Sequence, residues 1–334
     1  MTPEELRLNG KPMQRDSMTK NECFEKLAPE VKLFLNRINQ LSAPPLSMRT
    51  YKGMRQYVLS MVKQVERPHF TGTIEERTIL GPGGDIPIRI YTPEGPTPLP
   101  VLLFFHGGAW VLGNLDTEED TCLALARLTP CIAVSVDYRL APEHPYPSAL
   151  EDCYTTLQWV AEKADTFGGD QGRIAVSGES AGGNLAAALA LMSRQRKGPA
   201  IAFQLLFYPV TNLAEWHTES HRAFREGFFL KEEDMAGARS LYAPNEADWS
   251  SPYLSPLLAT DLRGLPPALV VTAGCDPLRD EGEAYAKRLQ NSGVHASHVC
   301  YEDMIHAFLF FFKSAASRRK ALEHASEELR RAFV

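Results

Sequence analysis

The sequence predicts an α/β fold in which helices cover both faces of a mostly parallel sheet. Short, almost uninterrupted apolar runs recur along the chain, and helix-like stretches such as 117–128 and 147–163 separate most of them. Strands that are buried on both faces appear as continuous apolar runs, because no side chain alternates toward water. The expected strands lie at residues 101–105, 132–136, 173–176, 202–207, 268–273 and 296–301.

The segment before these strands is expected to be helical. Apolar residues recur at helical spacing from Phe24 to Leu41, Ala43-Pro44-Pro45 interrupts them, and the pattern resumes from Tyr51 to Val65. We expect residues 1–65 to form N-terminal cap helices.

The remaining chain, residues 66–334, is expected to be the main domain. It begins with two β-type runs, 73–80 and 86–91, and the glycine-rich turn between them predicts a hairpin. One stretch, about 211–258, is polar, aromatic-rich and irregular, and it lies between two expected strands. A long insertion at the carboxyl end of a strand is placed to cover a ligand crevice, so we interpret it as a second part of the cap.

Charge and composition argue against two classes of partner. The chain has 35 Lys and Arg against 41 Asp and Glu, which gives a net charge of -6. Nucleic acids are bound through basic surfaces, and no basic run is present. The N-terminal residues lack the apolar core of a signal sequence. Apolar runs such as 185–192 are far shorter than the roughly 20 residues that span a bilayer, so we expect a cytoplasmic protein with no membrane segment.

The cysteines give no sign of a metal site. Their spacing includes no CxxC pair and no Cys/His pattern suited to zinc. We therefore expect no metal and six reduced thiols that mostly act as small buried hydrophobic groups. The six are Cys23, Cys122, Cys131, Cys153, Cys275 and Cys300.

A candidate nucleophile follows the expected strand 173–176. Gly178-Glu179-Ser180-Ala181-Gly182 has the pattern G-x-S-x-G and precedes an alanine-rich helix. In this strand–turn–helix context, the glycines permit a tight turn that lifts the serine hydroxyl above the sheet. The competing interpretation is an ordinary turn between a strand and a helix.

A candidate oxyanion-binding loop follows the expected strand 101–105. His106-Gly107-Gly108-Ala109-Trp110 offers backbone N–H groups that no bulky side chain shields. We expect the oxyanion hole of an acyl-transfer reaction to be built from Gly107, Gly108, Ala109 and Ala181. Ala109 stands where this type of loop often has a third glycine, which matters only if the position needs positive φ or extra room.

With these motifs the chain resembles the hormone-sensitive-lipase family of α/β-hydrolases, above all its acetyl-esterase and carboxylesterase branch. The resemblance covers about residues 70–330. Its motifs are His106-Gly107-Gly108-Ala109-Trp110, Asp137-Tyr138-Arg139-Leu140-Ala141-Pro142-Glu143-His144-Pro145, Gly178-Glu179-Ser180-Ala181-Gly182, Asp276-Pro277-Leu278-Arg279-Asp280 and His306-Ala307-Phe308.

The resemblance implies a Ser-His-Asp triad in the chain order serine, acid, histidine. Asp276 follows the expected strand 268–273, and His306 precedes a C-terminal helix, so both have the expected places beside Ser180. Asp276 could instead cap a helix, with Asp280 or Asp303 as the acid. Other histidines lie too early, at the last strand (His295, His298) or in the cap (His217, His221). Glu179 is implied to tie the serine turn to neighbouring loops.

The resulting hypothesis is a serine carboxylesterase for short-chain acyl esters that needs no metal or organic cofactor. Candidate pocket residues are Trp110, Tyr208, Trp216 and Phe228. The alternatives are a specialised hydrolase or dehydratase on the same scaffold, such as a lactonase, a deacetylase or an aromatic dehydratase, or a non-catalytic small-molecule binder. The resemblance also implies a possible homodimer formed through the sheet edge and the last helix.

Overall fold

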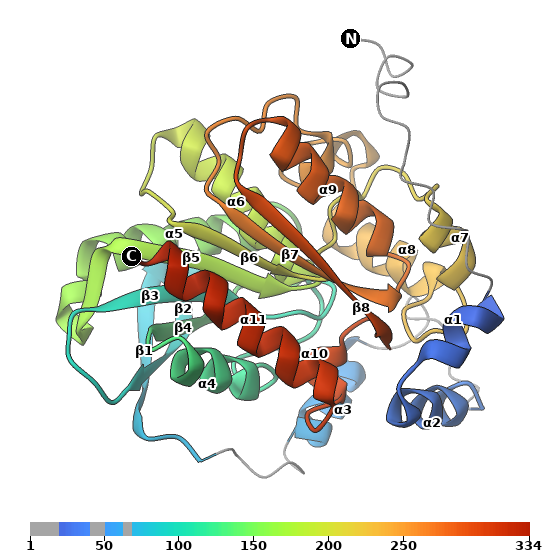
Figure 1. The fold of residues 1–334 in the computed structure, drawn as a ribbon. Helices are drawn as coiled ribbons and strands as arrows, with labels where there is room; N and C mark the ends of the chain where they lie inside the picture. The colour runs from blue at the N-terminus through green and yellow to red at the C-terminus, as the bar shows by residue number, and fades with distance from the viewer. Residues whose placement is uncertain (1–19, 41–50, 63–68) are drawn as a thin grey trace.

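A single eight-stranded sheet runs through the centre of the protein (Figure 1). The computed structural model describes residues 20–40, 51–62 and 69–334. The strand order is β1-β2-β4-β3-β5-β6-β7-β8. The strands are β1 (Gly72–Gly81), β2 (Gly84–Pro93), β3 (Leu99–Phe105), β4 (Ile132–Val136), β5 (Gly169–Glu179), β6 (Phe203–Phe207), β7 (Ala268–Cys275) and β8 (Ala296–Ile305).

The parallel part of the sheet confirms the expected α/β class. Strands β3 to β8 pair in parallel, whereas the hairpin of β1 and β2 joins the sheet through an antiparallel pairing of β2 with β4. Every residue of β3, β4, β6 and β7 is buried, which explains why these strands carry no polar alternation. Their carboxyl ends share one edge of the sheet, where the candidate motifs follow.

Helices cover both faces of the sheet (Figure 1). On one face, α5 (Ser148–Lys163), α6 (Ala181–Arg196) and α9 (Arg279–Asn291) share a core cluster with inward side chains of the strands. On the other face lie α4 (Glu119–Leu128) and α11 (Ala316–Ala332), in a second cluster. The short helices η3 (Ala164–Phe167) and α10 (Phe308–Phe311) complete the main body.

The described N-terminal residues are helical, but their first helical run is divided. The expected single helix from Phe24 is α1 (Lys20–Lys26) followed by α2 (Pro29–Ile38), and the next helix is α3 (Tyr51–Val62). Pro29 occupies the start of α2, and the residue before a proline is driven away from the helical conformation, so Ala28 breaks the run. Leu41, the Ala43-Pro44-Pro45 break, residues 63–65 and the expected domain boundary lie outside the described residues.

The expected insertion between β6 and β7 is present as a set of short helices. It holds α7 (Glu219–Phe224), α8 (Glu232–Tyr242), η4 (Glu246–Asp248) and η5 (Pro256–Leu258). Figure 1 shows α7 and α8 on the same side of the molecule as α1 and α2. None of the helices among the described residues is both long and apolar enough to cross a membrane.

The prediction that all six cysteines are reduced is wrong for two of them. Cys23 in α1 and Cys275 at the end of β7 form a disulfide across 252 residues of sequence. Both side chains are fully buried, because α1 packs against β7 and β8 and brings Cys23 to the end of the strand. A separation of this length leaves no spacing signal, so the sequence alone does not reveal the pair. Cys122, Cys131, Cys153 and Cys300 take part in no disulfide.

Candidate active site

Ser180 lies at the sharp turn between β5 and α6. Its backbone is in an unusual conformation, with φ 53° and ψ -112°. Two glycines make this turn possible, because a Cβ on Gly182 would lie 2.0 Å from the carbonyl oxygen of Phe105 and one on Gly178 would lie 2.3 Å from the backbone of Gly182. The turn therefore packs directly on β3 and leaves the serine side chain at the carboxyl edge of the sheet.

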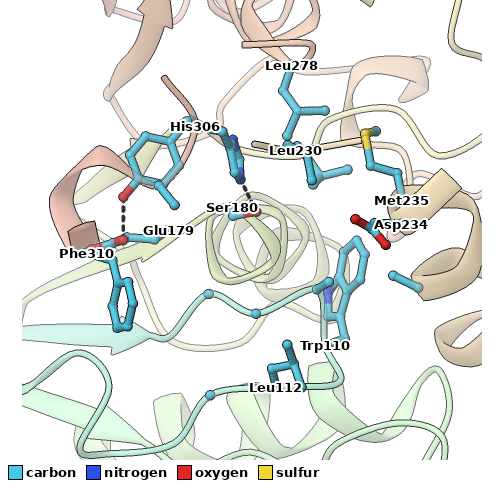
Figure 2. A pocket seen from close by; sticks show the side chains of 18 of the residues that line it. Trp110, Leu112, Glu179, Ser180, Leu230, Asp234, Met235, Leu278, His306 and Phe310 are labelled. Atoms are coloured by element: carbon cyan, nitrogen blue, oxygen red, sulfur yellow. Dashed lines mark hydrogen bonds between the residues drawn. The ribbon is translucent and has the colours of Figure 1, made fainter. Parts of the chain in front are cut away.

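His306 and Asp276 complete a continuous hydrogen-bonded series with Ser180, and Figure 2 shows the bond between His306 and Ser180. The distance between His306 Nε2 and Ser180 Oγ is 2.9 Å, and that between His306 Nδ1 and Asp276 Oδ2 is 2.8 Å. Asp276 is fully buried, and its Oδ1 accepts the N–H of Leu278 at 2.9 Å. These contacts orient the imidazole so that Nε2 faces the serine hydroxyl.

The alternative acids lie in other hydrogen-bond networks. Asp280 accepts the N–H of Ser220 at 2.7 Å, and Asp303 accepts the hydroxyl of Ser317 at 2.8 Å. Among the alternative histidines, the ring of His221 stacks on Trp216, while His298 Nε2 lies 2.8 Å from Thr272 Oγ1. The structure brings together only one of the sequence's candidate combinations, namely Ser180, His306 and Asp276.

The oxyanion loop, residues 106–110, lies next to Ser180. Gly108 and Ala109 have φ of 109° and 55°. Ala109, which stands where such loops often have a third glycine, therefore does adopt a left-handed backbone, and this conformation costs alanine about 1–2 kcal/mol. In the part of the chain that the structure describes, the amides of Gly108, Ala109 and Ala181 donate no hydrogen bond. Ala181 is the first residue of α6, whose amide has no partner within the helix.

Gly107, the fourth expected oxyanion donor, lies against the Ser180 turn, since an added Cβ on it would be 3.3 Å from the Glu179 carbonyl oxygen. Its role as a donor stays a prediction.

Two aromatic rings fix the start of the oxyanion loop. His106 stacks on Tyr138 with ring centroids 4.1 Å apart, and its Nδ1 lies 2.7 Å from the carbonyl oxygen of Gly107. Complete burial lowers the pKa of His106 to about 4, so the ring is neutral. Its Nδ1–H donates a hydrogen bond to the carbonyl oxygen of Gly107. The hydroxyl of Tyr138 donates to the His106 carbonyl oxygen at 2.8 Å.

Glu118 is a site residue that the sequence analysis missed. It precedes α4 within Thr117-Glu118-Glu119, where acidic residues are usually solvated or favoured by the helix dipole. In the structure its side chain is buried next to that of Glu179, the neighbour of Ser180. In the sequence, the only hint of this place is the pair of adjacent acids Glu118-Glu119, for which the expected elements offer no charged partner.

A cavity of about 280 Å³ opens at Ser180 and is lined mainly by apolar side chains. The expected residues Trp110, Tyr208 and Trp216 line it. Figure 2 shows Trp110, Leu230 and Met235 on one side of Ser180 and Phe310 on the other. Further lining residues are Met54 and Val58 of α3 and Leu213, Phe229 and Ala238 of the insertion.

Phe228 is not a cavity residue, contrary to the sequence-based expectation. Its side chain is buried against Phe224, with ring centroids 5.0 Å apart. The turn at Gly227, with φ 87°, and at Phe229, with φ 75°, directs the neighbouring Phe229 into the cavity instead.

Arg239 of α8 also lines the cavity. Its guanidinium lies 4.0 Å from the ring centroid of Trp216 and 3.6 Å from that of Trp249, and it donates to the Leu213 carbonyl oxygen at 2.7 Å. These contacts hold α8 on the start of the insertion. The described residues contain no group of three or more His, Cys, Asp or Glu side chains that could hold a metal ion.

A mostly parallel sheet with a strained serine turn at the end of β5 defines the class of α/β hydrolases. The family model Abhydrolase_3, described as an alpha/beta hydrolase fold, matches residues 102–310. The chain therefore belongs to this family, which confirms the resemblance to hormone-sensitive-lipase-like hydrolases.

Similar proteins are named as esterases. The carboxylic ester hydrolase LipN of Mycobacterium tuberculosis is 41% identical over 265 residues, which are 78% of this chain and 70% of LipN. An arylesterase of Saccharolobus solfataricus is 37% identical over 85% of this chain and 92% of its own. The solved structure of a hyperthermophilic esterase from Pyrobaculum calidifontis superposes with a TM-score of 0.86 at 40% identity, covering 91% of this chain and 98% of that one.

Proposed function

We propose that this carboxylic ester hydrolase cleaves short-chain acyl esters through a covalent acyl-enzyme on Ser180. The observation that carries the proposal is the continuous hydrogen-bonded series from Ser180 through His306 to the buried Asp276. The relatives named as esterases, at about this level of identity over most of the chain, support the reaction class. A serine hydroxyl needs a base to remove its proton during attack, and Nε2 of His306 is within reach.

The proposed reaction has two steps. Ser180 Oγ attacks the ester carbonyl while His306 Nε2 takes its proton, and His306 then passes that proton to the leaving alcohol. Water, activated by the same imidazole, adds to the acyl group on Ser180 and releases the acid. Asp276 holds Nδ1–H and stabilises the imidazolium that forms in each step.

The carbonyl oxygen becomes negatively charged in both tetrahedral intermediates. The amides of Gly108, Ala109 and Ala181 are the donors that we propose for it, because none of them has a hydrogen-bond partner among the described residues. Fixed donors of this kind lower the barrier by about 2.7–4 kcal/mol each.

The preference for short acyl chains follows from the size and walls of the cavity. Its volume of about 280 Å³ is at the lower end of small-molecule sites, roughly 300–1,000 Å³. Trp110, Tyr208 and Phe310 are bulky parts of its wall. We propose that these rings limit the length of the acyl group.

Hydrolysis of p-nitrophenyl esters from acetate to palmitate, at neutral pH without added metal, tests the proposal. We expect the highest kcat/KM on the shortest chains, and a loss of at least about 10³-fold in kcat in Ser180→Ala. Ser177→Ala, which removes a buried hydroxyl on the same strand, is the control and should keep its turnover. A folded wild type without activity on any ester would direct the search to lactones, amides, dehydration or a bound ligand.

Three further proposals concern the whole protein. Residues 1–65 and 211–258 form a cap over the catalytic domain 66–334, supported by the cavity residues that α3 and α8 supply.

Two copies associate through β8, the last strand in the sheet order, and α11. The protein is cytoplasmic, a proposal supported by the four of its six cysteines that take part in no disulfide. Sedimentation velocity and cell fractionation test the latter two.

A further inference from the structure

A cluster of phenylalanine rings joins α2 to the wall of the cavity at Ser180. Phe229 of the insertion and Phe311 of α10 line this cavity, and their ring centroids are 4.8 Å apart. Phe34 of α2 lies behind them and contacts both, with its ring centroid 6.0 Å from that of Phe229 and 4.9 Å from that of Phe311. Three segments that are far apart in the sequence therefore meet at one part of the wall.

The short helix α10 places this part of the wall close to the reacting groups. The helix begins directly after His306 and Ala307, and Ala307, Phe310 and Phe311 all line the cavity. Figure 2 shows Phe310 across Ser180 from the labelled side chains of α8. Phe311, with the ring of the insertion that it contacts, therefore bounds the cavity on the α10 side of the nucleophile.

Contacts at both ends of α2 fix the position of Phe34. Just before α2, the amide of Ala28 donates to the carbonyl oxygen of Asp303 in β8 at 3.0 Å, and the disulfide anchors the preceding helix α1 to β7. Just after α2, Nδ2 of Asn39 donates to the carbonyl oxygen of Gly227 at 2.9 Å. Gly227 belongs to the turn of the insertion that carries the wall ring, so this bond joins α2 to the wall a second time.

Phe34 supplies packing that the two wall rings need. Phe229 has φ 75°, which a residue other than glycine adopts only at a cost, so its position depends on the contacts around it. Phe34 itself is held edge-on against Phe312, with ring centroids 5.4 Å apart and planes at 87°. Because protein interiors are close-packed, loss of the Phe34 ring leaves a gap into which Phe229 and Phe311 can move.

We propose that Phe34 is a positioning residue for acyl-chain specificity: it holds Phe229 and Phe311 against the cavity and so excludes longer acyl chains. The inference rests on the proposed ester hydrolysis at Ser180. The acyl group is the part concerned, because α10 also carries Phe310, one of the rings assigned above to limiting its length. Outward movement of the wall would let the cavity bury further methylenes, each worth about fourfold in kcat/KM.

Acyl-chain selectivity of Phe34→Ala tests this role. For each variant, kcat/KM is measured on p-nitrophenyl acetate, butyrate, hexanoate and octanoate, together with the midpoint of thermal unfolding. Phe311→Ala removes one wall ring directly, and the double variant shows whether Phe34 acts through that ring. Leu33→Ala changes the neighbouring residue of α2, whose side chain is 73% exposed, and is the matched control.

We expect Phe34→Ala and Phe311→Ala each to raise the ratio of kcat/KM on hexanoate to that on acetate by at least about fivefold, a little more than one methylene. The double variant should raise the ratio by less than the product of the two single effects. Leu33→Ala should keep the ratio within about twofold of the wild type. If Phe34→Ala does not fold, Phe34→Leu takes its place, with a rise in the same direction.

Three results would overturn the role of Phe34. One is a folded Phe34→Ala or Phe34→Leu with the wild-type ratio, even at a lower unfolding midpoint, because the ring would then only attach α2 to the main body. The second is a Leu33→Ala with an equal rise, and the third is a double variant whose effect equals the product. A wild type that hydrolyses no ester means that the proposed function fails, whereas an active wild type with unchanged ratios removes only this inference.

Discussion

At the scale of single residues, the orientation of His306 depends on one carboxylate. Asp276→Asn keeps the shape of the side chain but can present an N–H to Nδ1 and stabilise the wrong tautomer of the imidazole. We expect kcat for p-nitrophenyl acetate to fall by about 10³- to 10⁴-fold in this variant. Asp280→Asn and Asp303→Asn change the two other candidate acids and should stay within about threefold of the wild type. A loss of comparable size in either, with Asp276→Asn active, would reassign the acid.

Residues whose role follows from local pattern could be predicted, and residues whose role depends on distant partners could not. Ser180 is marked by glycines that its turn requires, and these lie within two positions of it. Glu118 and Cys23 depend on contacts with Glu179 and Cys275, and 252 residues separate the two cysteines. The choice of Phe228 was wrong for a related reason, since adjacent side chains at a turn point in different directions and the sequence does not show which faces inward.

At the scale of elements, the disulfide attaches α1 to the end of β7, the strand that Asp276 directly follows. Removing a native disulfide costs about 2–4 kcal/mol, in the view that the link restricts the unfolded chain. We expect Cys23→Ala to unfold at a lower temperature than the wild type and to be insensitive to reductant, while reductant lowers the midpoint of the wild type. Cys131→Ala removes a buried free thiol and should keep the response to reductant. Equal midpoints for wild type and Cys23→Ala in oxidising buffer would contradict this prediction.

The boundaries of elements were predicted where burial alone decides them. Strand β4 (Ile132–Val136) coincides with its apolar run, because each of its residues is buried. Strand β8 extends to Ile305, beyond the expected end at Tyr301, because its pairing with β7 shifts register after Tyr301 and resumes between Cys275 and Ile305, just before His306. The polar residues Glu302 and Asp303 lie in this irregular stretch and conceal the extension in the sequence, although Met304 and Ile305 beyond them are buried.

At the scale of the whole molecule, buried acids make stability depend on pH. Burial raises the pKa of Glu281 to about 8 and that of Asp137 to about 6, against unfolded values of 4.5 and 3.8. The folded protein then holds protons that the unfolded chain releases. The stability associated with a group of raised pKa is full below its unfolded value and is lost as the pH rises toward its folded value. For Glu281 this window runs from about pH 4.5 to about pH 8.

The contribution of Glu281 to the free energy of unfolding should therefore decrease between pH 6 and pH 8, by about 1.4 kcal/mol per pH unit while its proton is retained. Glu281 accepts the amides of Thr211 and Asn212 through Oε1, at 2.6 and 3.2 Å, so the carbonyl of Glu281→Gln can keep both bonds that join α9 to the insertion. Denaturant unfolding at pH 6, 7 and 8 gives the free energy of unfolding as a function of pH. Its decrease with pH should be smaller in this variant than in the wild type, by the equivalent of about one proton. If its slope equals that of the wild type, Glu281 is already ionised in the folded protein.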